Sequence, residues 1–204
     1  MMSLKKLLPL FSYLFHPLFV PLYATVSFFF MDDTYLSAIE KFLLTIQIII
    51  VTILIPGVFF FFLRSLGKVS SIMASEARER ILPLFIQIVL IGILISQGPI
   101  FERIPELYYF FLSAMLSSFI AMVYAFYNMK ISIHLIGMAV WIFFAIGMSF
   151  YNQINAISFI SILIFLTGIV ASSRLYMKAH VNKELALGFL SGMLSQMTLW
   201  IFWL

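Results

Sequence analysis

The chain contains no cysteine and few charged residues. Its 204 residues include 12 Lys and Arg, 8 Asp and Glu and 3 His, so charged side chains make up only 10% of the sequence. Without Cys, disulfides and thiolate catalysis are excluded. Soluble domains contain about 25% charged residues, so this composition excludes an ordinary soluble domain. The net charge of +4 is too small and too dispersed to indicate a nucleic-acid partner.

Apolar residues dominate instead, at 64% of the chain, and the mean hydropathy is +1.14. Several stretches approach the roughly 20 residues that a helix needs to cross a bilayer. They are Leu8–Met31, Phe42–Leu63, Ile81–Gln97, Leu107–Tyr127, Ile131–Phe150, Ile157–Ser172 and Leu185–Leu204. Because the links between them are short, we expect a single integral membrane domain over residues 1–204. The fold class predicted is all-α, a polytopic transmembrane bundle of six to seven helices in a lipid bilayer, with no soluble appendage.

The first stretch, Leu8–Met31, has two interpretations. Pro9, Pro17 and Pro21 each remove a backbone donor from it and disfavour a continuous helix. The stretch is therefore either a kinked crossing or a re-entrant segment. A kinked crossing gives seven crossings in total, and a re-entrant segment gives six.

Ionisable residues concentrate in the segment Ser173–Glu184, which lies between two apolar stretches. Charge within or beside a bilayer is unfavourable, so such residues are usually functional. Arg174 can hold an anionic oxygen in a bidentate fork, and His180 can act as a nucleophile or as an acid and base. Glu184 follows His180 by four residues, so on one helical face it can fix the tautomer of the imidazole. The alternative for Glu184 is a cap at the start of the last helix.

Two other links are expected on the same membrane face as this segment. Residues 64–80, 128–130 and 173–184 are separated from one another by two crossings each, which returns the chain to the same side. The residues that they add to this face are Arg78, Arg80, Lys130, Ser132 and His134. Two histidines among several cations are typical of phosphoryl transfer through a histidine, in which one imidazole attacks phosphorus and the other protonates the leaving oxygen.

Three further features have ordinary structural interpretations. For His16, which precedes Pro17, a packed or capping imidazole is favoured over one that lines a cavity. The histidines have no ligand spacing and the acidic residues Asp32, Asp33, Glu102 and Glu106 fall on the other face, so we expect neither a metal nor a cofactor. Gly188 and Gly192 form a G-x-x-x-G that packs against another helix, which leaves open an internal contact or a homodimer.

The three charged segments resemble the motifs of the type 2 phosphatidic acid phosphatase family of membrane lipid phosphatases. That family shows Lys-x6-Arg-Pro, then Pro-Ser-Gly-His, then Ser-Arg-x5-His-x3-Asp. Ser173–Glu184 is similar to the third motif, with Glu in place of Asp. Lys130–His134 looks like a reduced second motif, and Arg78–Pro83 is a loose counterpart of the first. With FHPLFVP near its start, the chain is also similar to a compact, membrane-only bacterial branch.

The resemblance implies a role for each matching residue. It makes His180 the nucleophile that forms a phosphohistidine, with Glu184 as its orienter and His134 as the general acid, and it implies catalysis without a metal. The implied phosphate contacts are Arg174 and Ser132, followed by Arg80, Arg78 and Lys130. Arg80, Arg78 and Lys130 are included because Met73 stands where the family has its Lys, so another cation has to contact the phosphate. Ile133 replaces the glycine before the general acid.

The sequence thus predicts a membrane lipid phosphatase acting on a phosphate or diphosphate headgroup. The alternative is a non-catalytic binder or transporter of anionic lipid that uses the same cations. A purely structural membrane subunit is disfavoured by the collected His and Arg residues. We expect the protein in a bacterial inner membrane. The distribution of Lys and Arg favours a cytoplasmic site, whereas the resemblance favours the outer face.

Overall fold

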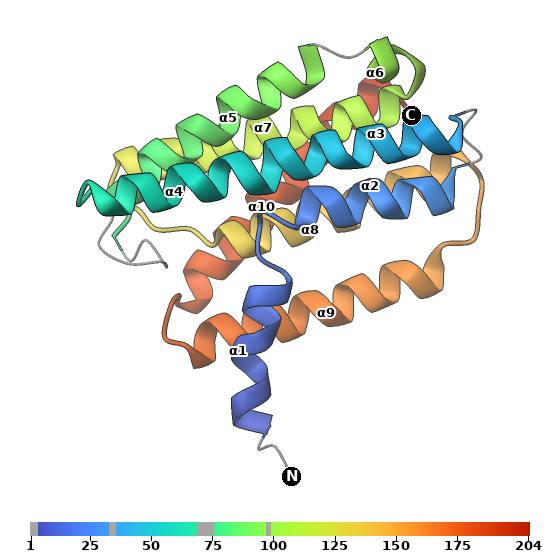
Figure 1. The fold of residues 1–204 in the computed structure, drawn as a ribbon. Coiled ribbons are helices and arrows are strands. Elements are labelled where there is room, and N and C mark those ends of the chain that lie inside the picture. The colour runs from blue at the N-terminus through green and yellow to red at the C-terminus, as the bar shows by residue number, and fades with distance from the viewer. Residues whose placement is uncertain (1–3, 33–35, 69–75, 97–98) are drawn as a thin grey trace.

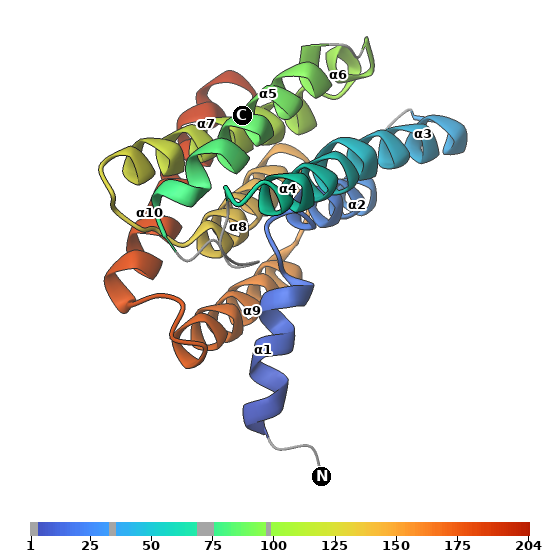
Figure 2. The same cartoon turned by 60° about the vertical axis from the view of Figure 1, so that its left-hand side comes forward.

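The computed structural model describes residues 4–32, 36–68, 76–96 and 99–204, and over these ranges it contains helices and no strand (Figures 1 and 2). This confirms the all-α fold. The α-helices are α1 (Leu4–Leu14), α2 (Val20–Met31), α3 (Ala38–Ile49), α4 (Ile55–Ser65), α5 (Ile81–Ser96), α6 (Pro99–Arg103), α7 (Pro105–Phe126), α8 (Ile133–Tyr151), α9 (Ile157–Tyr176) and α10 (Asn182–Leu199). Shorter helical segments are η1 (Ile50–Leu54), η2 (Arg78–Arg80) and η3 (Trp200–Phe202).

Six helical segments of the described chain are long and apolar enough to cross a membrane. They are Ala38–Ser65, Arg78–Ser96, Pro105–Phe126, Ile133–Tyr151, Ile157–Tyr176 and Asn182–Phe202. They correspond to the second through seventh apolar stretches of the sequence. The first stretch is divided, because only the 12 residues of α2 continue as an apolar helix. A helix of that length spans about 18 Å, short of the ~30 Å of hydrocarbon in a bilayer.

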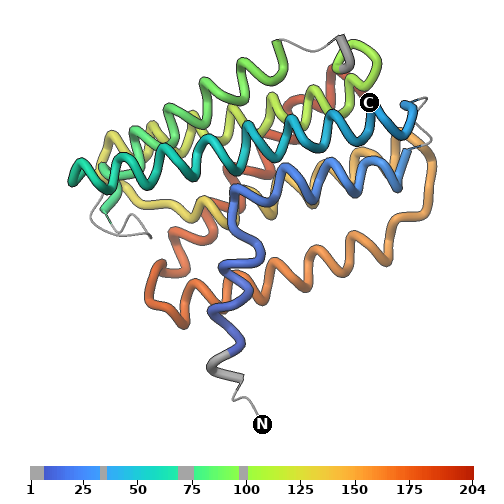
Figure 3. The backbone as a smooth tube through the Cα atoms, viewed as in Figure 1, coloured from blue at the N-terminus to red at the C-terminus, as the bar shows by residue number. Residues whose placement is uncertain are grey.

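The division between α1 and α2 has a local cause. Pro17 has no N–H, so the ladder of helical hydrogen bonds cannot pass through it. The link instead forms tight turns, in which the N–H of His16 donates to Tyr13 O at 3.3 Å and the N–H of Phe19 donates to His16 O at 2.8 Å. Figure 3 shows the chain changing direction here, so that α1 crosses α9 instead of continuing along the bundle.

The helix α8 is the centre of the bundle and packs against α2, α7, α9 and α10. Its contact with α10 depends on glycine. A Cβ on Gly188 would overlap the carbonyl oxygen of Ser132, and a Cβ on Gly192 would overlap that of Ile136. The G-x-x-x-G surface, which the sequence left open to a homodimer contact, is therefore occupied by α8 of the same chain. Any contact with a second copy through Gly188 and Gly192 would have to displace α8.

The long segment Ala38–Ser65 contains a π-helical turn, η1, between α3 and α4. The N–H of Ile55 reaches back to Ile50 O, and Pro56 follows at the start of α4. A proline inside a helix lacks one donor and crowds the preceding turn, and a wider turn accommodates it. The segment thereby continues as one helical span, and both η1 and α4 pack against α5.

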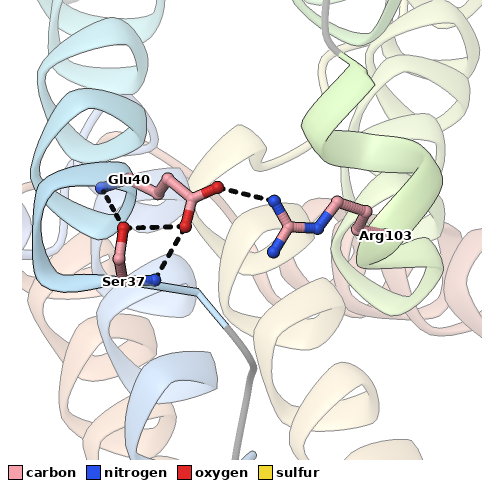
Figure 4. Close-up of polar contacts among 3 residues, drawn as sticks. All are labelled: Ser37, Glu40 and Arg103. Carbon is pink, nitrogen blue, oxygen red and sulfur yellow. Dashed lines mark hydrogen bonds and ion pairs between the residues drawn. The ribbon is translucent and has the colours of Figure 1, made fainter.

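The two ends of the bundle carry different chemistry. The last turns of α4, α7 and α9 and the first turns of α5, α8 and α10 meet at one end, at the left of Figure 1. This is the arrangement that the two-crossing separation predicts. At the opposite end, Arg103 of α6 forms an ion pair with Glu40 of α3, whose other oxygen accepts from the backbone and hydroxyl of Ser37 (Figure 4). Glu40 thus caps α3 and joins it to α6.

Candidate functional site

Hydrogen bonds to the backbone join the three charged segments that the sequence singled out. The guanidinium of Arg80 donates to Ile131 O at 2.9 Å. The N–H of Ser132, one residue further on, donates to the carbonyl oxygen of Glu184 at 3.1 Å. These contacts bring η2, the start of α8 and the start of α10 together, although long stretches of sequence separate them.

A cavity of about 350 Å³ lies beside these contacts. The His and Arg side chains in its wall are His16, Arg80, His134, Arg174 and His180. Each comes from a different part of the fold: the α1–α2 link, η2, α8, α9 and the α9–α10 link. Four of the predicted site residues therefore share a single cavity, and a fifth, Glu184, contacts it through His180.

The remaining wall of the cavity is largely apolar. The helices α4, α5, α7 and α8 contribute side chains such as Phe60, Leu63, Ile86, Phe110 and Val140. Binding sites for small molecules commonly have this composition, with a few polar groups at defined positions in an apolar pocket. Cations at one part of the wall and hydrocarbon along the rest suit an amphiphile with an anionic head.

The other predicted residues do not line the cavity in the described structure. Ser132 is fully buried and caps α8, because its hydroxyl accepts from the N–H of Leu135 at 3.4 Å. Arg78 is exposed. Lys130 is half-buried, and burial followed by the charge of Arg80 lowers the pKa of its ammonium group. Lys130 thus lies within electrostatic reach of the site without forming its wall.

His180 and Glu184 form the pair that their spacing predicts. Nδ1 of His180 lies 2.7 Å from Oε2 of Glu184. Since a carboxylate only accepts, Nδ1 carries the proton and Nε2 of a neutral imidazole is left with a free lone pair. The same Oε2 also accepts from the N–H of Val181, at the longer distance of 3.4 Å. Orientation of His180 and capping of α10 are therefore both present.

The surroundings of His180 favour its neutral form. The residue is only 6% exposed, and burial lowers its pKa from 6.5 to about 4. The hydrogen bond to Glu184 opposes this shift, while the charges of Arg80, Arg174 and Lys130 add to it. At neutral pH the imidazole is consequently uncharged, as a nucleophile must be.

This pKa predicts how stability depends on pH. The folded-state pKa of about 4 lies below the ordinary 6.5, so between these values the unfolded chain binds a proton that the folded chain does not. The contribution of His180 to the free energy of unfolding is complete above pH 6.5 and is lost as the pH falls toward 4. We expect the apparent unfolding temperature in detergent to fall more steeply from pH 7 to pH 4.5 for the wild type than for His180→Gln. Parallel curves for the two proteins would contradict the lowered pKa.

The second histidine of the site is held by α1. Nε2 of His134 donates to the carbonyl oxygen of Ser12 at 3.0 Å. A carbonyl only accepts, so Nε2 carries a proton and Nδ1 remains available for proton transfer. The hydroxyl of Ser12 also lies 2.6 Å from that of Ser173, the residue before Arg174. One residue of α1 thus contacts both the second and the third predicted segment.

Arg174 is a buried cation that no carboxylate of the described residues pairs with. The residue is 5% exposed, and its Nε is buried with no hydrogen-bond partner. No carboxylate lies within 4.0 Å of it in the parts of the chain that the structure describes. Burial of an unpaired charge is strongly unfavourable. The arrangement is therefore complementary to an anion placed in the cavity.

His16 is packed and capping, as the sequence favoured, because its Nδ1 accepts from the N–H of Leu18. The structure also places it in the cavity wall, the interpretation that the sequence disfavoured. Its ring lies edge-to-face with that of His134, with centroids 5.3 Å apart. Ser12 and Tyr13 of α1 also reach the wall, and sequence reasoning missed both. The only signal for this region was a histidine at the point where Pro17 breaks the helix.

In the described part of the chain, no group of three or more His, Asp or Glu side chains is arranged to bind a metal ion. Comparison with family models, with curated proteins and with solved structures finds no match to the chain. The function of the protein must therefore be inferred from the residues of the cavity.

Proposed function

We propose that this chain is a membrane lipid phosphatase that hydrolyses a phosphate or diphosphate headgroup through a phosphohistidine intermediate. The observation that carries the proposal is the presence, in one cavity, of an oriented neutral His180 and a buried Arg174 that no carboxylate within the described ranges pairs with. The motif resemblance to type 2 phosphatidic acid phosphatases supports it, and supports a bacterial inner membrane as the location. We place the substrate's tail against the apolar wall.

In the first step, the lone pair of His180 Nε2 attacks phosphorus and the bond from phosphorus to the lipid oxygen breaks. For this step His134 is the imidazolium, with protons on both nitrogens: Nε2–H stays on Ser12 O and the leaving oxygen takes the proton from Nδ1. In the second step, water attacks the phosphohistidine, the phosphorus–nitrogen bond breaks, and the water proton returns to His134. Inorganic phosphate and the lipid alcohol leave, and both histidines regain their starting states.

The cations act on charge that develops at phosphorus. Arg174 offers a planar fork that matches two phosphate oxygens, and Arg80 lies in the same cavity wall. Donors that are fixed before the reaction stabilise the transition state without reorganisation. The apolar wall holds the tail and thereby orients the headgroup toward His180.

The test is phosphate release by purified protein in detergent. Diacyl phosphatidate, a polyprenyl phosphate and a polyprenyl diphosphate are supplied in the presence of EDTA. We expect release from at least one of them without added metal. Tight binding without any release would instead support the alternative, a non-catalytic binder or transporter of anionic lipid.

Glu184 provides a prediction that separates orientation from capping. If Glu184 orients His180, Glu184→Gln should reduce kcat by at least ~100-fold, a moderate form of the loss that follows removal of such an orienter. Glu184→Asp should keep part of the rate, because it retains the charge. Steady-state kinetics on the preferred lipid phosphate measures both. Near-normal phosphate release by Glu184→Gln would leave Glu184 as a cap for Val181 alone.

A further inference from the structure

The link between α1 and α2 is held against the site at two places. Ser12, close to the end of α1, contacts His134 through its carbonyl oxygen and Ser173 through its hydroxyl. These contacts are independent of each other and attach to different helices, α8 and α9. His16 follows four residues later and enters the same cavity wall as His134 and Arg174.

A backbone contact selects the tautomer of His16. The N–H of Leu18 donates to Nδ1 of His16 at 3.3 Å. Nδ1 therefore acts as an acceptor, and in the neutral imidazole the proton resides on Nε2. His16 thus brings one N–H donor to the site, and its Nδ1 is already occupied.

The ring of His16 is fixed by two aromatic neighbours. It lies edge-to-face with His134 at 5.3 Å and edge-to-face with Phe19 at 6.4 Å. A donor whose ring is held in this way loses little freedom when it binds a ligand. The cavity beside it contains Arg174, whose charge calls for an anion.

The sequence lacks one donor that the resemblance leads us to expect. The first segment, around Arg80, has no lysine seven residues before it. A phosphate has three non-bridging oxygens to satisfy, and Arg174 can pair with only two of them in a bidentate fork. Arg80 shares the cavity wall, but its guanidinium also donates to Ile131 O, so His16 adds a donor for the remaining oxygen.

We infer that His16 is a phosphate-binding residue of this site, which donates a hydrogen bond from Nε2 to an oxygen of the bound headgroup. The inference rests on the proposed function, because the headgroup is its ligand. It gives α1 and the α1–α2 link a role in substrate recognition. His16 takes no part in bond making or breaking.

Two substitutions and a matched control test the role. His16→Phe keeps a ring against Phe19 and His134 but removes the donor. His16→Gln keeps an N–H near the position of Nε2. Phe19→Leu disturbs the packing of His16 but leaves its donor. The probe is dodecyl phosphate, whose dissociation constant is measured by calorimetry in detergent, alongside KM and kcat for phosphate release.

We expect His16→Phe to raise the dissociation constant and KM by about 10- to 100-fold, the effect of removing one hydrogen bond to a charged oxygen. Its kcat and apparent unfolding temperature should change little. His16→Gln should recover most of the affinity, and Phe19→Leu, which keeps the donor, should lose much less affinity than His16→Phe. A purely structural histidine would show the opposite pattern, with lost stability and no rescue by Gln.

The outcomes also separate this inference from the proposed function. Unchanged affinity in His16→Phe, or an equal loss in Phe19→Leu, overturns the role of His16 while phosphate release by the wild type stands. A wild type that binds dodecyl phosphate through His16 but releases no phosphate overturns catalysis and keeps the binding residue. A wild type that does neither overturns both.

Discussion

Replacing His180 by Ala is expected to reduce phosphate release by more than about 10⁴-fold, because no other group can replace an attacking nucleophile. The imidazole is well placed for this role. Glu184 holds the proton on Nδ1, burial keeps the ring neutral, and the ring lines the cavity that contains Arg174. Without His180 the carboxylate of Glu184 still reaches water, since its side chain is 25% exposed, so the fold should survive.

Two measurements check this result. Lys183→Ala, an exposed change at the start of α10, is the matched control and should keep its activity. A phosphoryl group trapped from ³²P-labelled substrate should appear on the wild type in an acid-labile, alkali-stable form and be absent from His180→Ala. Substantial phosphate release by a folded His180→Ala would remove His180 from its proposed role.

Replacing Arg174 by Met is expected to lower kcat/KM by about 10²- to 10³-fold, the usual effect of removing one preorganised donor to developing charge. The same change should not destabilise the protein. Arg174 is buried, and no carboxylate among the described residues offsets its charge. Replacing an uncompensated buried cation by an apolar side chain of similar length removes a desolvation penalty. We therefore expect an apparent unfolding temperature equal to or above that of the wild type.

Ligand binding separates this interpretation from a structural role. Dodecyl phosphate should raise the unfolding temperature of the wild type, because it binds only the folded state, and should have a much smaller effect on Arg174→Met. Arg174→Lys keeps the charge but loses the planar fork, so it should recover only part of the activity. A strongly destabilised Arg174→Met would contradict the prediction and indicate that the guanidinium supports the fold.

The sequence by itself determined the class of the fold. The length and polarity of the apolar stretches predicted the crossing helices, because a bilayer requires about 20 apolar residues for each. Counting crossings then placed Arg80, His134 and His180 at one end of the bundle, and the structure brings them into one cavity. The spacing of His180 and Glu184 predicted their contact, since residues four apart meet on one side of a helical turn. These are local or topological properties that depend little on packing.

Only the tertiary structure decided how distant segments meet. Ser12 contacts Ser173 across 161 positions and His134 across 122, and no periodicity of the sequence encodes either contact. The same packing placed His16 in the cavity wall, turned Ser132 into a buried cap and closed α8 over Gly188. The physical reason is that a side chain's surroundings depend on which helices pack beside it and at which depth. The break at Pro17 predicts that α1 and α2 do not form one continuous helix. Only the packing of the other helices decides that Ser12 and His16 lie beside the site.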